Sequence, residues 1–273
     1  MPTPDCSNKK EPMSTPTLTA VRHRRIRYFQ LPLLLGLLLI WHFLVHFQVV
    51  SAFFFGEPIK VFIQIWRWFS TGTIFPHLGI TLLETMLAFV LGLVLGMAAG
   101  FWLGLSPGAS ILLDPYIKAL NAMPRVILGP IFVVWFGLGI WSKVMLGFTL
   151  VFCIVFFNVF QGVREVSLNV LANARMLGAN KSQLLRSIYL PSATSWVFSS
   201  LHTSVGMAFV GAVVGEYLGS SSGVGYLILQ AEAVFDINSV LAGIIVLTAF
   251  ALVLDACVSV SEKRLLVWRP VPQ

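Results

Sequence analysis

Charged residues are scarce in this chain of 273 residues, in which Lys, Arg, Asp and Glu together make up 11%. Soluble domains carry about 25% charged residues, and disordered chains combine low hydrophobicity with high charge. Both classes are therefore excluded. Apolar residues make up 57% of the chain, and its mean hydropathy is +0.87. This composition predicts an all-α, polytopic membrane protein.

Cysteine is scarce too, and Cys6, Cys153 and Cys257 lie far apart in the sequence. Their spacing excludes a disulfide framework and a redox motif. The chain also lacks a nucleotide-binding P-loop, because none of its lysines follows a glycine. His42 and His46 share one helical face, but no nearby Cys, Asp or Glu completes a metal ligand set. We therefore expect no metal, no bound cofactor and no catalytic residue.

Long apolar runs predict six transmembrane helices. The first covers 30–51 and follows a mobile tail at 1–29 whose end is basic. It is too long for the apolar region of a signal peptide, which has about 7–15 residues, so we expect an uncleaved helix. An aromatic-rich outer loop at 52–77 precedes the core at 78–262, and 263–273 forms the C-terminus. The five spans of the core are expected at about 79–105, 122–141, 143–161, 195–217 and 239–260.

Basic residues predict the orientation of these helices. With six spans both termini lie on one side, together with all but three of the 18 Lys and Arg residues. The exceptions are Lys60, Arg67 and Lys143. Because basic residues are retained on the cytoplasmic side, we expect both termini in the cytoplasm and the chain in the inner membrane of a bacterial cell. The net charge of +7 thus reports topology and requires no nucleic-acid partner.

Two of the expected spans carry glycine at every fourth position. The glycines are Gly92, Gly96, Gly100 and Gly104 in the second span, and Gly211 and Gly215 in the fifth. Because residues four apart share a helix face, each set forms a stripe that allows another helix to approach closely. We interpret both stripes as helix-packing surfaces, and an interface that slides during function is the alternative.

Acidic residues inside apolar spans are rare and mark candidate functional sites. Glu84 and Asp255 are expected near the membrane interfaces, where hydration or pairing would make them structural. Glu216 ends the fifth span, and a Gly- and Ser-rich turn that contains Gly223 and Gly225 follows it. We interpret Glu216 and these two glycines as a candidate gate. A helix end held by local hydrogen bonds is the alternative.

The polar stretch at 162–191 is expected to carry two short helices. Apolar residues recur at helical spacing before Gly178, which suits a left-handed C-terminal cap. Asn180 and Gln183 form a capping-box pair for a second helix, and Pro191 is placed where the next span begins. Such a helix-turn-helix fits either a partner surface or an ordinary interfacial helix pair.

The spacing in this stretch resembles the EAA loop in permease subunits of binding-protein-dependent ATP-binding-cassette (ABC) importers. The residues in register with that pattern are Ala174, Gly178, Ile188, Leu190 and Pro191. Ala172 and Asn173 stand where the pattern opens with Glu-Ala. Two further stretches, 124–143 and 215–228, are similar to the nitrate/sulfonate/taurine branch of these permeases.

This resemblance implies the type I permease fold of ABC importers and a mechanism. Permeases of this branch pair as homodimers, dock two ATPase subunits that bind ATP and Mg²⁺, and receive substrate from an extracytoplasmic binding protein. The implied cargo is a small oxyanion of the sulfonate, taurine or nitrate type. The loop at 165–191 would contact the ATPase. The residues implied for this coupling are Ala172, Ala174, Leu177, Gly178, Ala179, Ile188, Leu190 and Pro191.

Two other classes of function are alternatives to an ABC importer permease. An ion-gradient-driven secondary transporter or channel needs no ATPase and typically shows broken helices with charges at the membrane midplane. A polytopic membrane enzyme requires clustered His, Asp and Glu or a Ser and His pair. Glu232 and Asp236 are close in sequence, but no nucleophile or pocket signature accompanies them.

Overall fold

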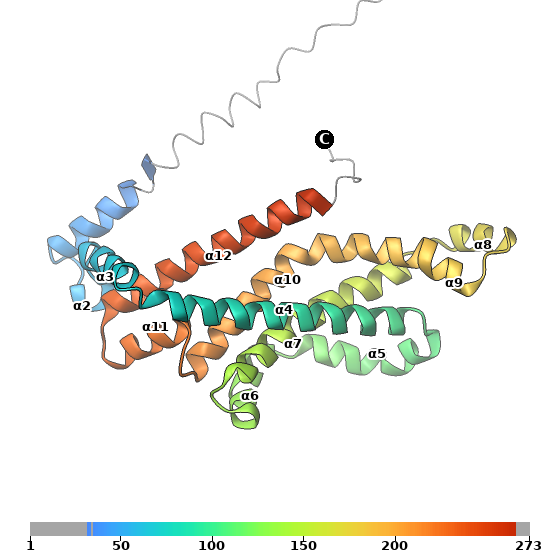
Figure 1. Cartoon of the computed structure of the whole chain (residues 1–273), viewed down its shortest axis with the longest axis horizontal. Helices are drawn as coiled ribbons and strands as arrows, with labels where there is room; N and C mark the ends of the chain where they lie inside the picture. The colour runs from blue at the N-terminus through green and yellow to red at the C-terminus, as the bar shows by residue number, and fades with distance from the viewer. Residues whose placement is uncertain (1–31, 34, 266–273) are drawn as a thin grey trace, which may run out of the picture. The chain divides into compact units, whose positions relative to one another are not determined.

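The computed structural model describes residues 32–33 and 35–265 (Figure 1). The expected tail at 1–29, the start of the first expected span and residues 266–273 lie outside the described residues. All regular elements within the described part are helices. The chain divides into two compact units, Met1–Pro58 and Ile59–Gln273.

The first unit contains the helix Leu35–His46 and the short helix α2 (Ala52–Phe55). The indole Nε1 of Trp41 donates a hydrogen bond of 3.2 Å to the carbonyl oxygen of Phe55. The helix Leu35–His46 alone is shorter than the roughly 20 residues that cross a bilayer. Part of the expected span at 30–51 is not described, so this crossing stays a prediction.

The second unit is a helical bundle. Four of its described helices contain segments that are long and apolar enough to cross a membrane. They are α4 (Ile74–Gly104), α7 (Ile140–Arg164), α10 (Leu190–Leu218) and α12 (Ile237–Leu265). The other elements are α3 (Pro58–Ser70), α5 (Pro107–Ala122), the 3₁₀ helix η1 (Arg125–Leu128), α6 (Gly129–Phe136), α8 (Leu168–Met176), α9 (Lys181–Leu184), the π-helix η2 (Leu185–Tyr189) and α11 (Val224–Ala233).

The third expected span, 122–141, is not a single helix. Proline disfavours helical backbone at the residue before it, and Met123, which precedes Pro124, is extended at φ −72° and ψ 129°. As a result α5 ends at Ala122, and the helical segment Arg125–Phe136 is bent by 86° from it. If this bent pair is one broken span, the described residues contain five spans. A total of six stays a prediction.

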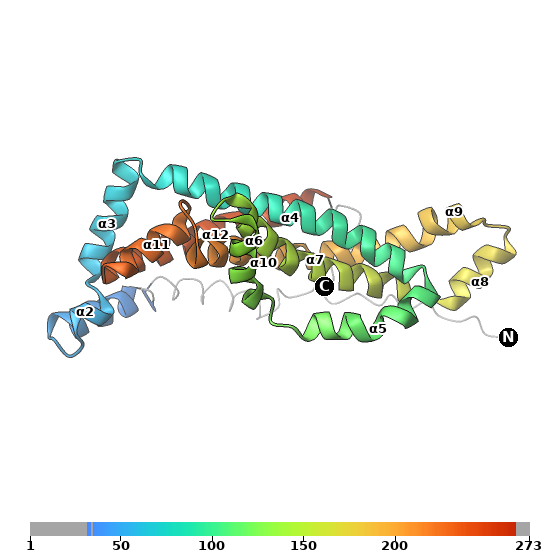
Figure 2. The ribbon, with the colours of Figure 1, turned by 90° about the horizontal axis from the view of Figure 1, so that it is seen from below.

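Helices α4 and α7 run in the same direction (Figures 1 and 2). Gly92 packs against Val151 near the middle of both helices, and Gly104 packs against Val163 at the end of both. The chain must therefore return between them, which it does through α5, η1 and α6. Helix α10 runs the other way, because Gly215 near its end packs against the start of α7. We call the end of the bundle where α4 and α7 finish the loop end, and the other the opposite end.

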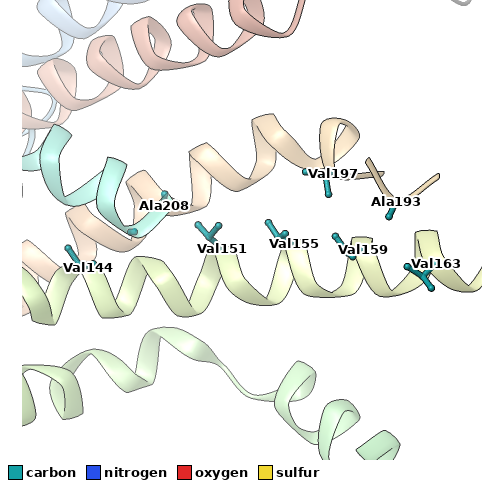
Figure 3. Close-up of a cluster of buried hydrophobic side chains, with 9 residues drawn as sticks. Val144, Val151, Val155, Val159, Val163, Ala193, Val197 and Ala208 are labelled. Carbon is teal, nitrogen blue, oxygen red and sulfur yellow. The ribbon is translucent and has the colours of Figure 1, made fainter. Parts of the chain in front are cut away.

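Four glycines of α4 each pack against one valine of α7. These four pairs, which we call the glycine–valine seam, are Gly92–Val151, Gly96–Val155, Gly100–Val159 and Gly104–Val163. A Cβ added at any of the glycines would lie 2.6–3.0 Å from the Cβ of its valine. The valines are buried and lie along one side of α7, as Figure 3 shows. In lipid, such close packing takes the place of the hydrophobic driving force between helices.

The glycines of α10 bring that helix equally close to α7. A Cβ at Gly211 would lie 2.3 Å from the Cα of Gly147, and one at Gly215 would lie 2.9 Å from the Cγ of Lys143. Both glycine stripes of the sequence therefore lie against α7. Helix α7 is the centre of the bundle. It packs against α4 and α10 so closely that the glycines of the two stripes leave no room for a larger residue.

Candidate coupling loop and buried polar cluster

The stretch between α7 and α10 folds into two helical segments joined by a tight turn. Helix α8 ends at Met176, and Gly178 follows with φ +83°, a left-handed conformation that glycine adopts without strain. The capping box expected from the sequence is present. The backbone N–H of Gln183 donates to the Asn180 Oδ1 at 2.9 Å, and the N–H of Asn180 donates to the Gln183 Oε1 at 2.8 Å.

Helix α9 continues without interruption into α10 through the π-helix η2. The N–H of Leu190 donates to the carbonyl oxygen of Leu185, five residues earlier. Proline has no N–H, and its ring clashes with the carbonyl four residues before it in a regular α-helix. The wider π-turn just before Pro191 accommodates this ring, because its hydrogen bonds skip one more residue. Pro191 is thus compatible with one continuous helical run from α9 to α10.

The two helical segments enclose an open groove of about 300 Å³. Its lining includes Ala174, Leu177, Gly178, Ala179 and Ile188. These are five of the eight residues predicted to contact an ATPase. The other three, which are Ala172, Leu190 and Pro191, do not line this groove. The local fold therefore gathers the central part of the predicted coupling set on one surface.

Several large apolar side chains in and just after α8 are exposed, and one of them, Leu177, lines the groove. The exposed fractions are 81% for Leu168, 80% for Met176 and 89% for Leu177. In both views α8 and α9 project past the end of α4 (Figures 1 and 2). Large apolar side chains exposed to this extent on one short segment are typical of a surface that another protein or a membrane covers. This surface and its groove together form the candidate coupling site.

A second site lies at the opposite end of the bundle, around Glu216 of α10. Its side chain is completely buried, and both carboxyl oxygens accept hydrogen bonds. The Thr81 hydroxyl of α4 donates to Oε1 at 2.6 Å, and the backbone N–H of Gly225 donates to Oε2 at 2.7 Å. The Thr81 oxygen in turn accepts from the N–H of Val224 at 3.2 Å. These bonds tie α4, α10 and the start of α11 together.

The two glycines of the predicted gate are required by the position of Glu216. Gly223 has φ +104°, and a Cβ there would lie 2.1 Å from the carboxyl carbon of Glu216. A Cβ at Gly225 would lie 2.7 Å from the carbonyl oxygen of Val213. The structure thus brings Glu216, Gly223 and Gly225 together in one contact. The hydrogen bonds around Glu216 are those of the alternative considered from the sequence, a helix end held in place, and they extend to a second helix.

Two more ionisable side chains are buried beside Glu216. Glu84 of α4 is 1% exposed and Lys143 of α7 is 0% exposed. The carboxyl groups of Glu84 and Glu216 interact with each other, and both interact electrostatically with Lys143. The Lys143 Nζ donates to the carbonyl oxygens of Leu138 at 2.5 Å and Gly139 at 2.8 Å. We call Glu84, Lys143 and Glu216 the buried polar cluster.

The sequence indicates only part of this cluster. For Glu84 it offered hydration or pairing, and burial against Glu216 selects pairing. From the sequence, Lys143 was counted only among the basic residues on the outer side of the membrane, although its side chain turns into the bundle. Thr81 was not singled out. A usable signal was present, since Lys143 stands near the start of one apolar span while the two glutamates lie in two others.

Asp255, the third acidic residue considered from the sequence, lies outside this cluster. Its Oδ1 is 4.0 Å from the Nε2 of His202, and its side chain is 61% exposed.

Comparison with known proteins gives a consistent result. The family described as binding-protein-dependent transport system inner membrane component matches residues 88–267. SsuC of Bacillus subtilis (strain 168), a permease protein named for aliphatic sulfonates transport, is 34% identical over 230 residues, which are 84% of this chain and 83% of SsuC. TauC, the taurine transport system permease protein of Escherichia coli (strain K12), is 29% identical over 237 residues, 85% of this chain and 86% of TauC.

A further relative is named for a different cargo. RibX, the riboflavin transport system permease protein of Chloroflexus aurantiacus, is 31% identical over 258 residues, 92% of this chain and 96% of RibX. Among solved structures, an inward-facing conformation of the MetNI methionine ABC transporter has a TM-score of 0.57. It is 16% identical, and the match covers 69% of this chain and 92% of that one. At this identity the likeness concerns the fold alone.

Proposed function

The chain belongs to the family of binding-protein-dependent transport system inner membrane components, and from this membership we propose how it works. It is a permease subunit of an ABC importer, a transport component rather than an enzyme. In our proposal it carries a small oxyanion across the membrane, driven by ATP hydrolysis on a separate subunit. An extracytoplasmic binding protein delivers the substrate, and two copies of this chain form the pathway. Both termini face the cytoplasm.

The groove between α8 and α9 supports the proposed coupling to the ATPase. The residues that it brings onto one exposed surface are Ala174, Leu177, Gly178, Ala179 and Ile188. A Cβ atom added at Gly178 would have no other atom within 4 Å, so the surface is open at this point. An element of the ATPase that enters this groove would move α9, and α9 is continuous with α10. This arrangement is the single observation on which the proposed coupling rests.

The proposed cargo rests on the relatives. SsuC and TauC are named for sulfonates and taurine, which share a tetrahedral anionic head group. RibX is named for riboflavin, which has none. The test is ligand binding by the soluble binding protein that acts with this chain, measured by calorimetry with taurine, an alkanesulfonate, nitrate and riboflavin. Binding of an oxyanion supports the proposal, whereas binding of riboflavin alone contradicts it.

Replacing Gly178 by leucine tests the coupling. A leucine there requires the strained left-handed backbone and places a bulky side chain at the groove, so ATP-dependent uptake into proteoliposomes should be lost. Insertion into the membrane should continue, because Gly178 makes no contact within the bundle. Gly79→Leu is the matched control, since it also has open space around it but lies in α4. Uptake at the wild-type rate in Gly178→Leu would refute the coupling role.

The alternative of an ion-gradient-driven transporter is tested in the same vesicles. The importer predicts uptake with ATP and the co-purifying ATPase, whether or not an ion gradient is present. A secondary transporter predicts uptake with a proton or sodium gradient and no ATP. Uptake under the second condition alone would refute the importer mechanism for this chain.

A further inference from the structure

The charges of the buried polar cluster do not balance when all three groups are ionised. Glu84 and Glu216 would carry two negative charges and Lys143 one positive charge, inside a bundle where none of the three is more than 1% exposed. An uncompensated charge in such a place is costly, and groups in it gain or lose protons instead. One additional proton makes the cluster neutral.

The contact between the two carboxyl groups indicates where this proton resides. Ionised carboxylates only accept hydrogen bonds, so two of them cannot hydrogen-bond to each other. Glu84 and Glu216 are both buried beside the single lysine Lys143, and two neighbouring carboxyl groups in such a place favour the binding of one proton. Both oxygens of Glu216 already accept bonds, from Thr81 and from Gly225, as expected for the ionised partner. The Glu84 Oε2 is buried and has no hydrogen-bond partner within the described residues, so a negative charge on Glu84 would be stabilised less than one on Glu216.

We propose that the buried polar cluster is a proton-binding site in which Glu84 and Glu216 share one proton. This proton holds α4 and α10 together at the opposite end of the bundle. The charged groups that face Glu84 are Glu216 and Lys143. Those that face Glu216 are Glu84 and Lys143, and α11 adds only the backbone N–H of Gly225. The nearby His77 of α4 accepts from the Gly223 N–H and stacks on Tyr226.

This proposal rests on the proposed function, in which the helices at this end of the bundle part to admit a substrate. Loss of the shared proton would leave one excess negative charge in the bundle. That state is stabilised only when water reaches the carboxylates, and water enters only if α4 and α10 separate. The proton site would therefore favour the closed form of this end when it is occupied, and the open form when it is empty.

Infrared difference spectroscopy tests the proton directly. The full chain, purified with its co-purifying ATPase and placed in lipid nanodiscs near neutral pH, should show the C=O stretching band of a protonated carboxyl group. The band should be absent in Glu84→Gln and in Glu216→Gln, because either change leaves one carboxylate balanced by Lys143. Glu232→Gln is the matched control, since Glu232 is exposed on α11 and outside the cluster, and it should keep the band.

Two results would overturn the proposal. The wild-type protein could lack the band, or the band could persist unchanged in both glutamine variants, which would assign it to another carboxyl group such as Asp255. Glu84→Gln preserves size and can donate to Glu216, so it should insert and fold. Lys143→Met gives an independent arm, because without the ammonium both carboxyl groups need protons and the band should grow about twofold. An unchanged band in Lys143→Met would also contradict the proposal.

The band is measured without substrate and without ATP, so its outcome is separate from that of the proposed function. A missing band refutes the proton site and leaves the importer intact. Absence of ATP-driven uptake with the band present refutes the proposed transport and leaves the proton site. In active vesicles, the uptake rates of the wild type and of Glu232→Gln should change between neutral and alkaline pH, whereas that of Glu84→Gln should not.

Discussion

The four seam glycines of α4 lie in regular helix and lack room for a side chain, whereas Gly178 of the coupling loop has open space around it and a left-handed backbone. In the seam, Cβ atoms would collide with Val151, Val155, Val159 and Val163 of α7, while at Gly178 nothing lies within 4 Å and φ is +83°. The same residue type thus serves two purposes. In the bundle it allows two helices to touch, and in the loop it allows the chain to turn.

This difference separates the effects of mutations in the two regions. Changes in the bundle should act on the stability of the whole protein, because α4, α7 and α10 share one core (Figure 3). Changes in the loop should act locally and on coupling, because α8 and α9 contribute few side chains to that core. Loop substitutions that lower global stability as much as seam substitutions would show that the two regions are not distinct.

The largest effect is expected for Gly100→Leu in the seam. A Cβ at this position would already lie 2.8 Å from the Cβ of Val159 and 2.9 Å from the carbonyl oxygen of Phe156, so α4 and α7 must separate. Overpacking of this kind costs about 3 kcal/mol. Thermal unfolding of the purified protein should show a lowered midpoint. Gly79→Leu in the same helix has open space and should unfold like the wild type; equal losses in both variants would argue against the seam.

A smaller loss of stability is expected for Thr81→Val at the opposite end of the bundle. This change keeps the shape of the side chain but removes a donor to Glu216 and an acceptor for the N–H of Val224. Leaving buried polar groups unsatisfied costs about 1–3 kcal/mol. Thr248→Val is the control, since Thr248 is exposed and bonds only within its own helix. If the two variants unfold at the same temperature, the bonds to Glu216 contribute nothing to stability.

Gly178→Val should cost about 1–2 kcal/mol within the loop, because a β-branched residue is strained at positive φ. Gly178→Asn should cost less, since asparagine tolerates the left-handed region. Hydrogen exchange of the α8 and α9 amides should rise in Gly178→Val, while the amides of α4 and α7 stay protected. Faster exchange throughout the bundle would break the distinction between the two regions.

The smallest effect is expected for Asn180→Ala, which removes the side-chain half of the capping box. Loss of such a cap costs about 1 kcal/mol. Amide exchange should increase at Gln183 and its neighbours in α9, with no change in the unfolding midpoint of the bundle. Ser182→Ala serves as the control, because Ser182 lies in the same turn of α9 and does not cap the helix.

Local features of this fold could be predicted from the sequence, and the reason is that nearby residues determine them. The capping box of Asn180 and Gln183 and the turn at Gly178 depend on a few neighbouring positions. The glycine stripe of α4 could likewise be recognised, but its partner could not, since nothing in the spacing indicates that α7 rather than another helix supplies the valines. The break at Met123 was missed because the apolar character of 122–141 outweighed the effect of Pro124.

The buried polar cluster could not be predicted, because burial is a property of the assembled bundle. Lys143 stands near the start of an apolar span, where a lysine commonly reaches water. Its side chain turns inward instead, to the carbonyl oxygens of Leu138 and Gly139. Glu84 and Glu216 are far apart in sequence, and only the antiparallel packing of α4 and α10 brings their carboxyl groups together.

The uninterrupted helix from Lys181 to Leu218 has a mechanical consequence. At 1.5 Å per residue its path is roughly 55 Å long. One of its ends lines the coupling groove, and the other carries Glu216. Because its helical turns follow one another without a gap, a displacement at one end can be passed along the helix to the other. A force applied at the groove would thus move Glu216 directly through this helix, and no chain of side-chain contacts would be needed between the two sites.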